Sequence, residues 1–403
     1  MKQAKKQTII RQIISICACL IISGTASAQQ DYNILQLLQE EGFEDIRTIM
    51  VEDTLFAAIE DRAHRGTFRG AATAIRTIAD RHPEVNNFEM LLTDYQMPQL
   101  IVHASKRGDI WSVSVDRQME KAVKVLKGVT PQAASTGKID VSFVPMVSLV
   151  NHAYDHLFDY AIRIAPAIAT TVWKGGRITI QPIFPILYNV KEGNRKRYIQ
   201  IANANLSQQI LSNREWTITA AAGFFHTERV GIHATVGYHV MRNLDFYIDG
   251  GYTWTANNSE DTGFGIIRNT GQTDFMAKID YYEPYTKLQI ELKGGKFLND
   301  YYGGRVDVTR HFGEYAIGLF GILANSDYEA GFHFAIPFGG KRQKRSAFVR
   351  LRLPEYYALE YNKVSMGVGQ SYVTQPDQNH AAHYWEPAYV QEYVQRMLNG
   401  TFQ

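Results

Sequence analysis

The feature that most constrains this chain is a long series of segments of about ten residues in which apolar and polar side chains alternate. In residues 232–238, for example, Ile, Ala, Val and Tyr alternate with His, Thr and Gly. Alternation with a period of two predicts β-strands, and the polar turns between segments predict antiparallel hairpins. The candidate strands are residues 138–150, 159–173, 177–189, 197–209, 215–225, 229–240, 244–255, 263–269, 272–282, 286–294, 303–312, 314–324, 329–338 and 345–353.

These strands can belong to a soluble sheet or to a membrane barrel, and two observations favour the barrel. Polar and charged residues on one face would be costly in a sandwich core but are solvated in a lumen. Aromatic residues near strand ends suit the girdles at two membrane interfaces; they are Trp173, Trp216, Tyr252, Trp254, Tyr281, Tyr282 and Tyr285. We therefore predict a mainly β chain with an antiparallel outer-membrane β-barrel of about 12–16 strands, rather than a soluble β-sandwich or solenoid.

The first 28 residues have the pattern of a cleaved signal peptide. A basic start precedes an apolar run from Ile13 to Ile22, which is shorter than the roughly 20 residues of a spanning helix. Residues 26–28, Ala-Ser-Ala, form a small-residue cleavage site. Both cysteines, Cys17 and Cys19, lie inside this segment, so cleavage removes every thiol unless Cys19 is lipidated.

Residues 29–112 are expected to form a small α+β domain in the periplasm. The pattern predicts a helix, strands at 46–51 and 55–59, a helix from Thr67, and strands at 88–95 and 100–104. Residues 113–137 carry no sustained period, and we interpret them as a connector whose piece of helix, 119–126, is solvated. The barrel is then expected over 138–353.

The tail, residues 354–403, loses the alternation and contains a short amphipathic helix at 390–398. Three placements remain open: in the lumen, beneath the barrel, or free. The basic run 341–345 is expected to be a solvated turn that could meet anionic lipid or polysaccharide.

Composition and motifs exclude several functions. Lys and Arg number 42 against 40 Asp and Glu, so the strong basic excess of a nucleic-acid-binding protein is missing. His380, His383 and Glu386 have helical spacing, but a following Pro387 argues against a metal site. His226 and His233 could serve as the base of a barrel enzyme, yet no Gly-x-Ser-x-Gly motif accompanies them. We predict no catalytic residues, metal or cofactor.

Four residues of one strand share a face: Arg305, Asp307, Thr309 and His311. If Val306 and Val308 meet lipid, this face lines the lumen. The strip could contact a saccharide, or it could be an internal ion-pair network that braces the barrel. We favour the brace, because barrels of this size are commonly filled by side chains.

Residues 295–338, GKFLNDYYGGRVDVTRHFGEYAIGLFGILANSDYEAGFHFAIPF, resemble the YjbH family of outer-membrane β-barrel proteins encoded with exopolysaccharide genes. The similar elements are a Gly-rich hairpin, an Asp-containing strand that ends in Arg-His-Phe, a Gly-rich strand, and the closing Phe-Ala-Ile-Pro-Phe. The N-terminal module also resembles the small periplasmic domains of this family, although this chain is shorter than its typical members.

The resemblance implies a non-enzymatic outer-membrane protein that assists the biosynthesis, export or surface attachment of an exopolysaccharide or capsule. Its expected partners are that glycan, outer-membrane lipid and periplasmic export proteins, and not nucleic acid. Two alternatives remain: an outer-membrane enzyme that hydrolyses or acylates lipid or glycan, and a generic diffusion porin.

Overall fold

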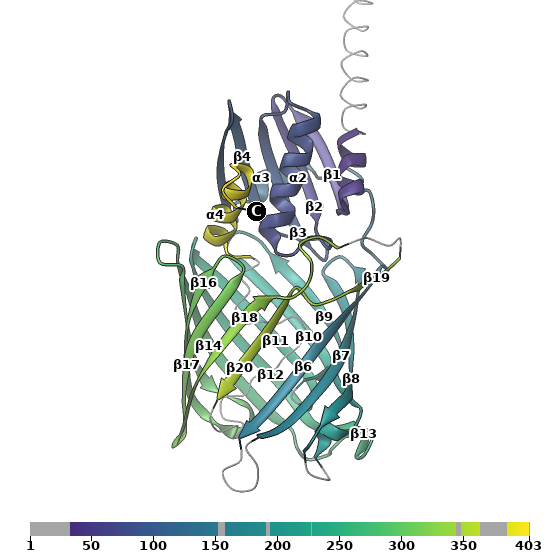
Figure 1. Ribbon diagram of the computed structural model, residues 1–403, viewed down its shortest axis with the longest axis vertical. Coiled ribbons are helices and arrows are strands. Elements are labelled where there is room, and N and C mark those ends of the chain that lie inside the picture. Colours follow the sequence, from purple (N-terminus) through teal and green to yellow (C-terminus); the bar gives the residue numbers. More distant parts are fainter. Residues whose placement is uncertain are drawn as a thin grey trace, which may run out of the picture.

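The computed structural model describes residues 33–402, except 152–157, 191–193, 227, 344–347 and 363–384. A large curved sheet curls into a barrel shape, and a smaller α/β domain sits on one of its ends (Figure 1). The expected signal peptide, both cysteines, His380 and His383 lie outside the described residues.

The N-terminal domain is a five-stranded sheet with helices on both faces. A helix at residues 33–41 comes first. Strand order follows the chain, and only the β2–β3 pair is parallel because α2 carries the chain from β2 back to the start of β3. The elements are β1 (Glu44–Val51), β2 (Thr54–Glu60), α2 (Thr67–Arg81), β3 (Asn87–Asp94), β4 (Met97–Arg107), β5 (Ile110–Asp116) and α3 (Glu120–Val125).

The prediction of a connector at 113–137 is wrong over its first half. Its first residues complete β5, which pairs with β4 and buries Val113 and Val115. The predicted solvated helix is α3, and it packs on the sheet through Met119, Ala122 and Leu126. The error arose because a six-residue helix is too short to show a helical period in sequence.

The C-terminal helix α4 (Pro387–Leu398) is a component of this domain's core. It packs against α2 and β5, so of the three placements left open the helix takes the one beneath the barrel (Figure 1). Tyr393 is 1% exposed, and its ring lies 5.2 Å from the ring of Phe68 on α2. We call residues 33–137 together with α4 the cap domain.

The large sheet has 15 strands. They are β6 (Ile139–Asn151), β7 (Phe158–Trp173), β8 (Gly176–Tyr188), β9 (Gln200–Ser212), β10 (Trp216–Phe225), β11 (Arg229–Met241), β12 (Leu244–Ser259), β13 (Gly263–Ile266), β14 (Gln272–Glu283), β15 (Leu288–Lys296), β16 (Tyr302–Phe312), β17 (Tyr315–Ala324), β18 (Asp327–Pro337), β19 (Val349–Arg352) and β20 (Tyr356–Asn362). Consecutive strands from β6 to β18 pair antiparallel, except that β14 replaces β13 beside β12.

The two ends of this sheet differ from the sequence prediction. The expected strand 263–269 is the short β13, which only folds back on the end of β12. The expected last strand, 345–353, is reduced to β19, which pairs parallel with β6. The strand β20 was not predicted, and it pairs with β18, so the sheet extends to Asn362 rather than to 353. Among the described residues, no hydrogen-bonded ladder joins β20 to β6 or β19.

The two faces of the large sheet differ in polarity. On β17, Ala316, Gly318 and Phe320 point inward, whereas Ile317 and Leu319 are 61% and 68% exposed on the outer face. The inner face carries polar and charged side chains that are buried by the barrel itself, such as Asn203, Thr253 and Asp307. The expected alternation is therefore present, with the apolar set turned outward.

Candidate functional site: the barrel interior and its closed ends

All four residues of the predicted strip point into the barrel, where each is less than a tenth exposed. Arg305 Nη2 lies 2.6 Å from Asp307 Oδ1 and 2.8 Å from Glu360 Oε2 of β20. Thr309 Oγ1 lies 2.9 Å from His333 Nε2 of β18, and the ring of His311 packs against Tyr389 of α4. Because these side chains contact other parts of the wall and the cap, they brace the interior. Contact with a glycan stays a prediction.

Arg305 and Asp307 of the strip belong to two rows of charged side chains, which the register of the strands aligns across neighbouring strands. The basic row consists of Lys278, Lys293 and Arg305. The acidic row lies two residues nearer the cap and consists of Asp245, Asp280, Glu291 and Asp307. Lys293 Nζ is 3.0 Å from Glu291 Oε2, and Lys278 Nζ is 3.7 Å from Asp280 Oδ2. Each cation is therefore paired with an acid, which offsets the cost of burying both charges.

The end of the barrel away from the cap is narrowed by a loop that folds inward. Phe297 and Leu298, between β15 and β16, are both 2% exposed. Phe297 packs against Met276, Phe320 and neighbouring interior residues, while Leu298 reaches Phe225 on β10. Asn299 has φ 61°, a left-handed conformation that Asn tolerates and that lets the chain reverse within the lumen.

The cap is held to the other end by a carboxylate shared between two arginines. Glu314, in the turn between β16 and β17, lies 2.7 Å from Arg65 Nε and 2.7 Å from Arg69 Nη2. All three side chains are at most 8% exposed. Burial alone would raise the pKa of Glu314, but hydrogen bonds from Arg65 and Arg69 outweigh it and lower the pKa. We call this contact the Glu314 clamp.

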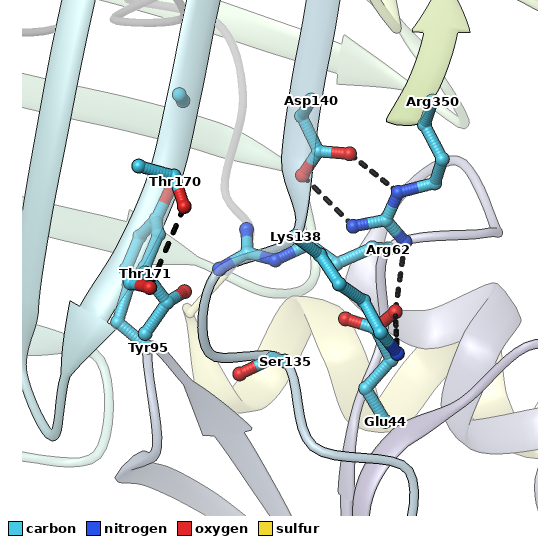
Figure 2. A pocket seen from close by; sticks show the side chains of 10 residues that line it. Glu44, Arg62, Tyr95, Ser135, Lys138, Asp140, Thr170, Thr171 and Arg350 are labelled. Carbon is cyan, nitrogen blue, oxygen red and sulfur yellow. Dashed lines mark hydrogen bonds and ion pairs between the residues drawn. The ribbon is translucent and has the colours of Figure 1, made fainter. Parts of the chain in front are cut away.

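A second polar contact joins β1 to the start of the barrel (Figure 2). Glu44 lies 3.0 Å from Lys138 Nζ and 3.5 Å from Arg350 Nη1. Arg350 in turn holds Asp140 of β6, with 2.8 Å between Nη2 and Oδ2. The pocket among these residues, also lined by Arg62, has room for about one water molecule. It is an interdomain joint rather than a ligand cavity.

Further ion pairs join the cap to the same end of the barrel. Arg117 Nη2 lies 3.1 Å from Asp245 Oδ2 of the acidic row. Lys287 Nζ lies 2.6 Å from Glu392 of α4. The basic run predicted to be a solvated turn also contacts the cap over its described part, since Arg342 pairs with Glu41 at 2.9 Å. Residues 344 and 345 of this run are not described.

The two histidines of the enzyme hypothesis, His226 and His233, lie at the outer end and on the interior face of the barrel. His233 faces the interior on β11 and lies in register with Ala221 and Gly251. Ser207 lies in the same row as His233 but two strands away, beyond β10, with about 10 Å between their backbones. A nucleophile and its base must instead lie within hydrogen-bond distance of each other. His226 lies in the turn that follows β10.

Glu386 has a structural position that its spacing from the two histidines did not indicate. It is the N-cap of α4, where its carboxylate accepts a hydrogen bond from the backbone N–H of Ala388 at 3.1 Å. Burial raises the pKa of Glu386 to about 8, although the charge of Arg117 acts in the opposite direction. No group of metal-binding side chains occurs in the part of the chain that the structure describes.

One half-buried ion network in the cap is expected to make the stability of this domain depend on pH. His103 Nδ1 lies 2.7 Å from Glu89 and its Nε2 lies 3.4 Å from Asp116, on three adjacent strands. Hydrogen bonds to Asp116 and then to Glu89 raise the pKa of His103 to about 9. Because the folded pKa exceeds the unfolded value of about 6.5, the stabilisation is complete below that value and is lost as pH rises through about 9.

We therefore expect His103→Gln to lower the urea midpoint of cap unfolding at pH 6 and to change it little at pH 10. The measurement is the difference in midpoint between variant and full-length wild type in detergent at the two pH values. A difference that stays equal at both pH values would contradict a charged His103.

Comparison with known proteins adds little to this description. No family model matches the chain, and a search of curated proteins finds no significant match. Among solved structures, a loop L8 deletion mutant of OmpT, an outer membrane protein of Vibrio cholerae, is similar at 12% identity and a TM-score of 0.26. That match covers 50% of this chain and 87% of the other, and with so low a TM-score nothing is inferred from it. No described helix is long and apolar enough to cross a membrane.

Proposed function

We propose that the chain is an outer-membrane β-barrel, closed on its periplasmic side by the cap, that acts without catalysis in the export or surface attachment of an exopolysaccharide or capsule. The observation that carries the membrane assignment is the outer face of the large sheet. Side chains such as Ile232, Leu319 and Leu323, on strands β11 and β17, are each 61% or more exposed. A continuous apolar face of this kind is unfavourable in water and favourable in lipid.

Aromatic residues support the same placement because they gather at the two ends of the outer face. Trp173, Trp216, Phe312 and Tyr315 lie at the cap end, and Tyr252, Tyr302 and Tyr328 lie at the other end; each is 40% or more exposed. Amphipathic rings are favoured at the level of lipid headgroups. Two such groups, one at each end of the strands, are what a barrel crossing one membrane would present.

Turn lengths support the orientation. At the cap end the connections from β7 to β8, β9 to β10, β11 to β12, β14 to β15 and β16 to β17 have two to four residues. Short turns are typical of the periplasmic side of bacterial barrels, and longer loops of the outer side. The cap would then be periplasmic, in agreement with the expected export signal.

The polysaccharide role is supported by the resemblance of residues 295–338 to the YjbH family. That segment supplies Arg305 and Asp307 to the charge rows, Phe297 to the inward loop, and Glu314 to the clamp. Its side chains therefore narrow the lumen at the outer end and fasten the cap at the inner end. A lumen that is narrowed at one end and capped at the other favours a gated or anchoring role over the alternative of a generic diffusion porin.

The experiment is deletion of the gene in its own host, with exopolysaccharide measured separately on the cell surface and in the periplasm. We expect surface polysaccharide to fall and to return when the wild-type gene is restored. Unchanged polysaccharide in both fractions would refute the proposed role.

A double variant, His226→Ala with His233→Ala, separates this function from the enzyme hypothesis. If it restores surface polysaccharide as well as wild type does, neither histidine is a required base. Failure to restore it, in a barrel that still shows heat-modifiable migration on gels, would favour the enzyme. Large and unselective conductance of the wild type in planar bilayers would favour a porin instead.

A further inference from the structure

Arg163, in the outer half of the barrel, is a buried cation that has no counter-ion among the described residues. It lies on the interior face of β7, where its side chain is 9% exposed. Its one polar contact in the described part of the chain is from Nη1 to Gln200 Oε1, at 3.3 Å. Its Nε, also buried, has no hydrogen-bond acceptor among the described residues. A guanidinium has five N–H donors, so most of them are unused here.

Other interior arginines show how unusual this is. Arg305, also 9% exposed, is paired with Asp307 and Glu360. Arg229, 4% exposed, has no carboxylate partner in the described part of the chain but donates to Thr253 Oγ1 at 3.0 Å, to Thr255 Oγ1 at 2.7 Å and to the carbonyl of Thr253 at 2.8 Å. Arg163 has neither arrangement, although an uncompensated buried charge is strongly unfavourable.

The surroundings of Arg163 increase this cost rather than reduce it. Nearby on the same wall, Ala165, Ile183 and Ala202 form an apolar cluster with Val144 and Met146. A charge beside such a cluster is poorly solvated. Packing alone would therefore favour a neutral residue at position 163, where this sequence has an arginine.

Two more basic side chains approach the same place from loops at the outer end. Lys196, in the short helix η1 (Arg195–Arg197), donates to Ser148 of β6 at 2.5 Å. Burial and then the charge of Arg163 lower the pKa of Lys196, while Asp159 acts in the opposite direction. Burial and then Arg163 also lower the pKa of His226, in the turn after β10. Arg163 and Lys196 thus reach one interior region from two parts of the chain, because Gln200, the partner of Arg163, also donates to the carbonyl of Arg195 in η1.

We propose that Arg163 and Lys196 form a binding site for an oxyanion carried by a saccharide, such as the carboxylate of an acidic sugar unit. The planar guanidinium accepts a carboxylate, sulfate or phosphate through two parallel hydrogen bonds, and the lysine adds a second charge. The ligand would supply the counter-ion that is missing among the described residues. This inference rests on the proposed polysaccharide function and specifies the chemistry of the glycan.

The first test measures binding to the purified full-length protein in detergent. The probes are an oligogalacturonate, a neutral maltooligosaccharide of the same length, and inorganic sulfate. We expect the oligogalacturonate to bind more tightly than the other two. We also expect Arg163→Met to weaken its binding by about tenfold or more, the value of a lost charge-assisted hydrogen-bonded pair. Lys196→Gln, on a loop, tests the same site if the Arg163 variant does not fold.

The second test compares thermal unfolding of two variants without ligand. Arg163→Met removes an unpaired charge and is expected to raise the unfolding temperature. Arg305→Met, at an equally buried arginine, leaves Asp307 without this partner and is expected to lower the unfolding temperature. A fall in unfolding temperature for both variants would show that Arg163 has a structural role and would overturn the proposal.

Three binding results would also overturn it: an oligogalacturonate that does not bind, equal binding by Arg163→Met, or sulfate that binds as tightly as the oligosaccharide. None of them depends on the polysaccharide measurements in the deletion strain. A host that needs the protein for a neutral polysaccharide would therefore refute this site and leave the proposed function standing.

Discussion

Replacing Glu314 with alanine is expected to release the cap from the barrel. The substitution leaves the guanidinium groups of Arg65 and Arg69 buried without their shared carboxylate. Removing one partner of a buried ion pair typically costs about 3–5 kcal/mol. In this protein that cost falls on the docked state, because an undocked cap exposes both arginines to water. The population of undocked cap should therefore rise by more than a hundredfold.

Limited proteolysis of the intact protein in detergent measures this change. The segment 127–137, between the cap sheet and β6, should be cut much faster in Glu314→Ala than in wild type. Glu215→Ala is the matched control, because Glu215 is an exposed residue in another turn at the same end of the barrel. Equal cleavage of Glu314→Ala and the control would show that the clamp does not hold the cap.

The second large effect is expected from Tyr393→Ala in the C-terminal helix. The ring of Tyr393 is buried among those of Phe68, Tyr389 and Phe402, at 5.2, 4.8 and 5.0 Å between centroids. Truncation of a buried aromatic side chain costs about 3–5 kcal/mol. A domain of this size is typically stable by only about 5–15 kcal/mol, so this loss is a large fraction of it.

Hydrogen exchange in α2 and β5 measures the loss, because these elements pack directly on α4. Both should lose protection in Tyr393→Ala, while the strands of the barrel retain theirs. Gln395→Ala changes the same helix at a half-buried position and should have little effect. Unchanged protection in α2 would mean that the cap is stable without α4.

Sequence predicted the repetitive parts of this fold and missed the parts that depend on partners far along the chain. The long strands from β6 to β18 were predicted because each has about ten residues of alternation or strong β composition. β20 was missed because it follows Pro354, and its Tyr and Ala residues do not alternate clearly. α3 was missed as a packed element because burial of Met119 depends on a sheet formed from residues 44–116.

The same contrast applies to the candidate site. The inward direction of Arg305 and Asp307 follows from the parity of one strand, so sequence was sufficient for it. Glu314 was not singled out, since its partners lie about 250 residues earlier and no local pattern links them. A basic pair with helical i, i+4 spacing, Arg65 and Arg69, was the one signal available. Arg163 was likewise not singled out, because the lack of a counter-ion among the described residues is a property of the folded interior.

The position of α4 imposes an order on biogenesis. The cap's sheet is encoded before the barrel, yet its core lacks Tyr389, Val390 and Tyr393 until the residues that follow the barrel have been synthesised. Until then the face that α2 and β5 present to α4 is open to solvent and is an aggregation hazard. Completion of the cap must therefore wait for synthesis of the whole barrel. A chain truncated anywhere in the barrel would leave its first domain unfinished, so quality control acting on that domain would detect an incomplete barrel as well.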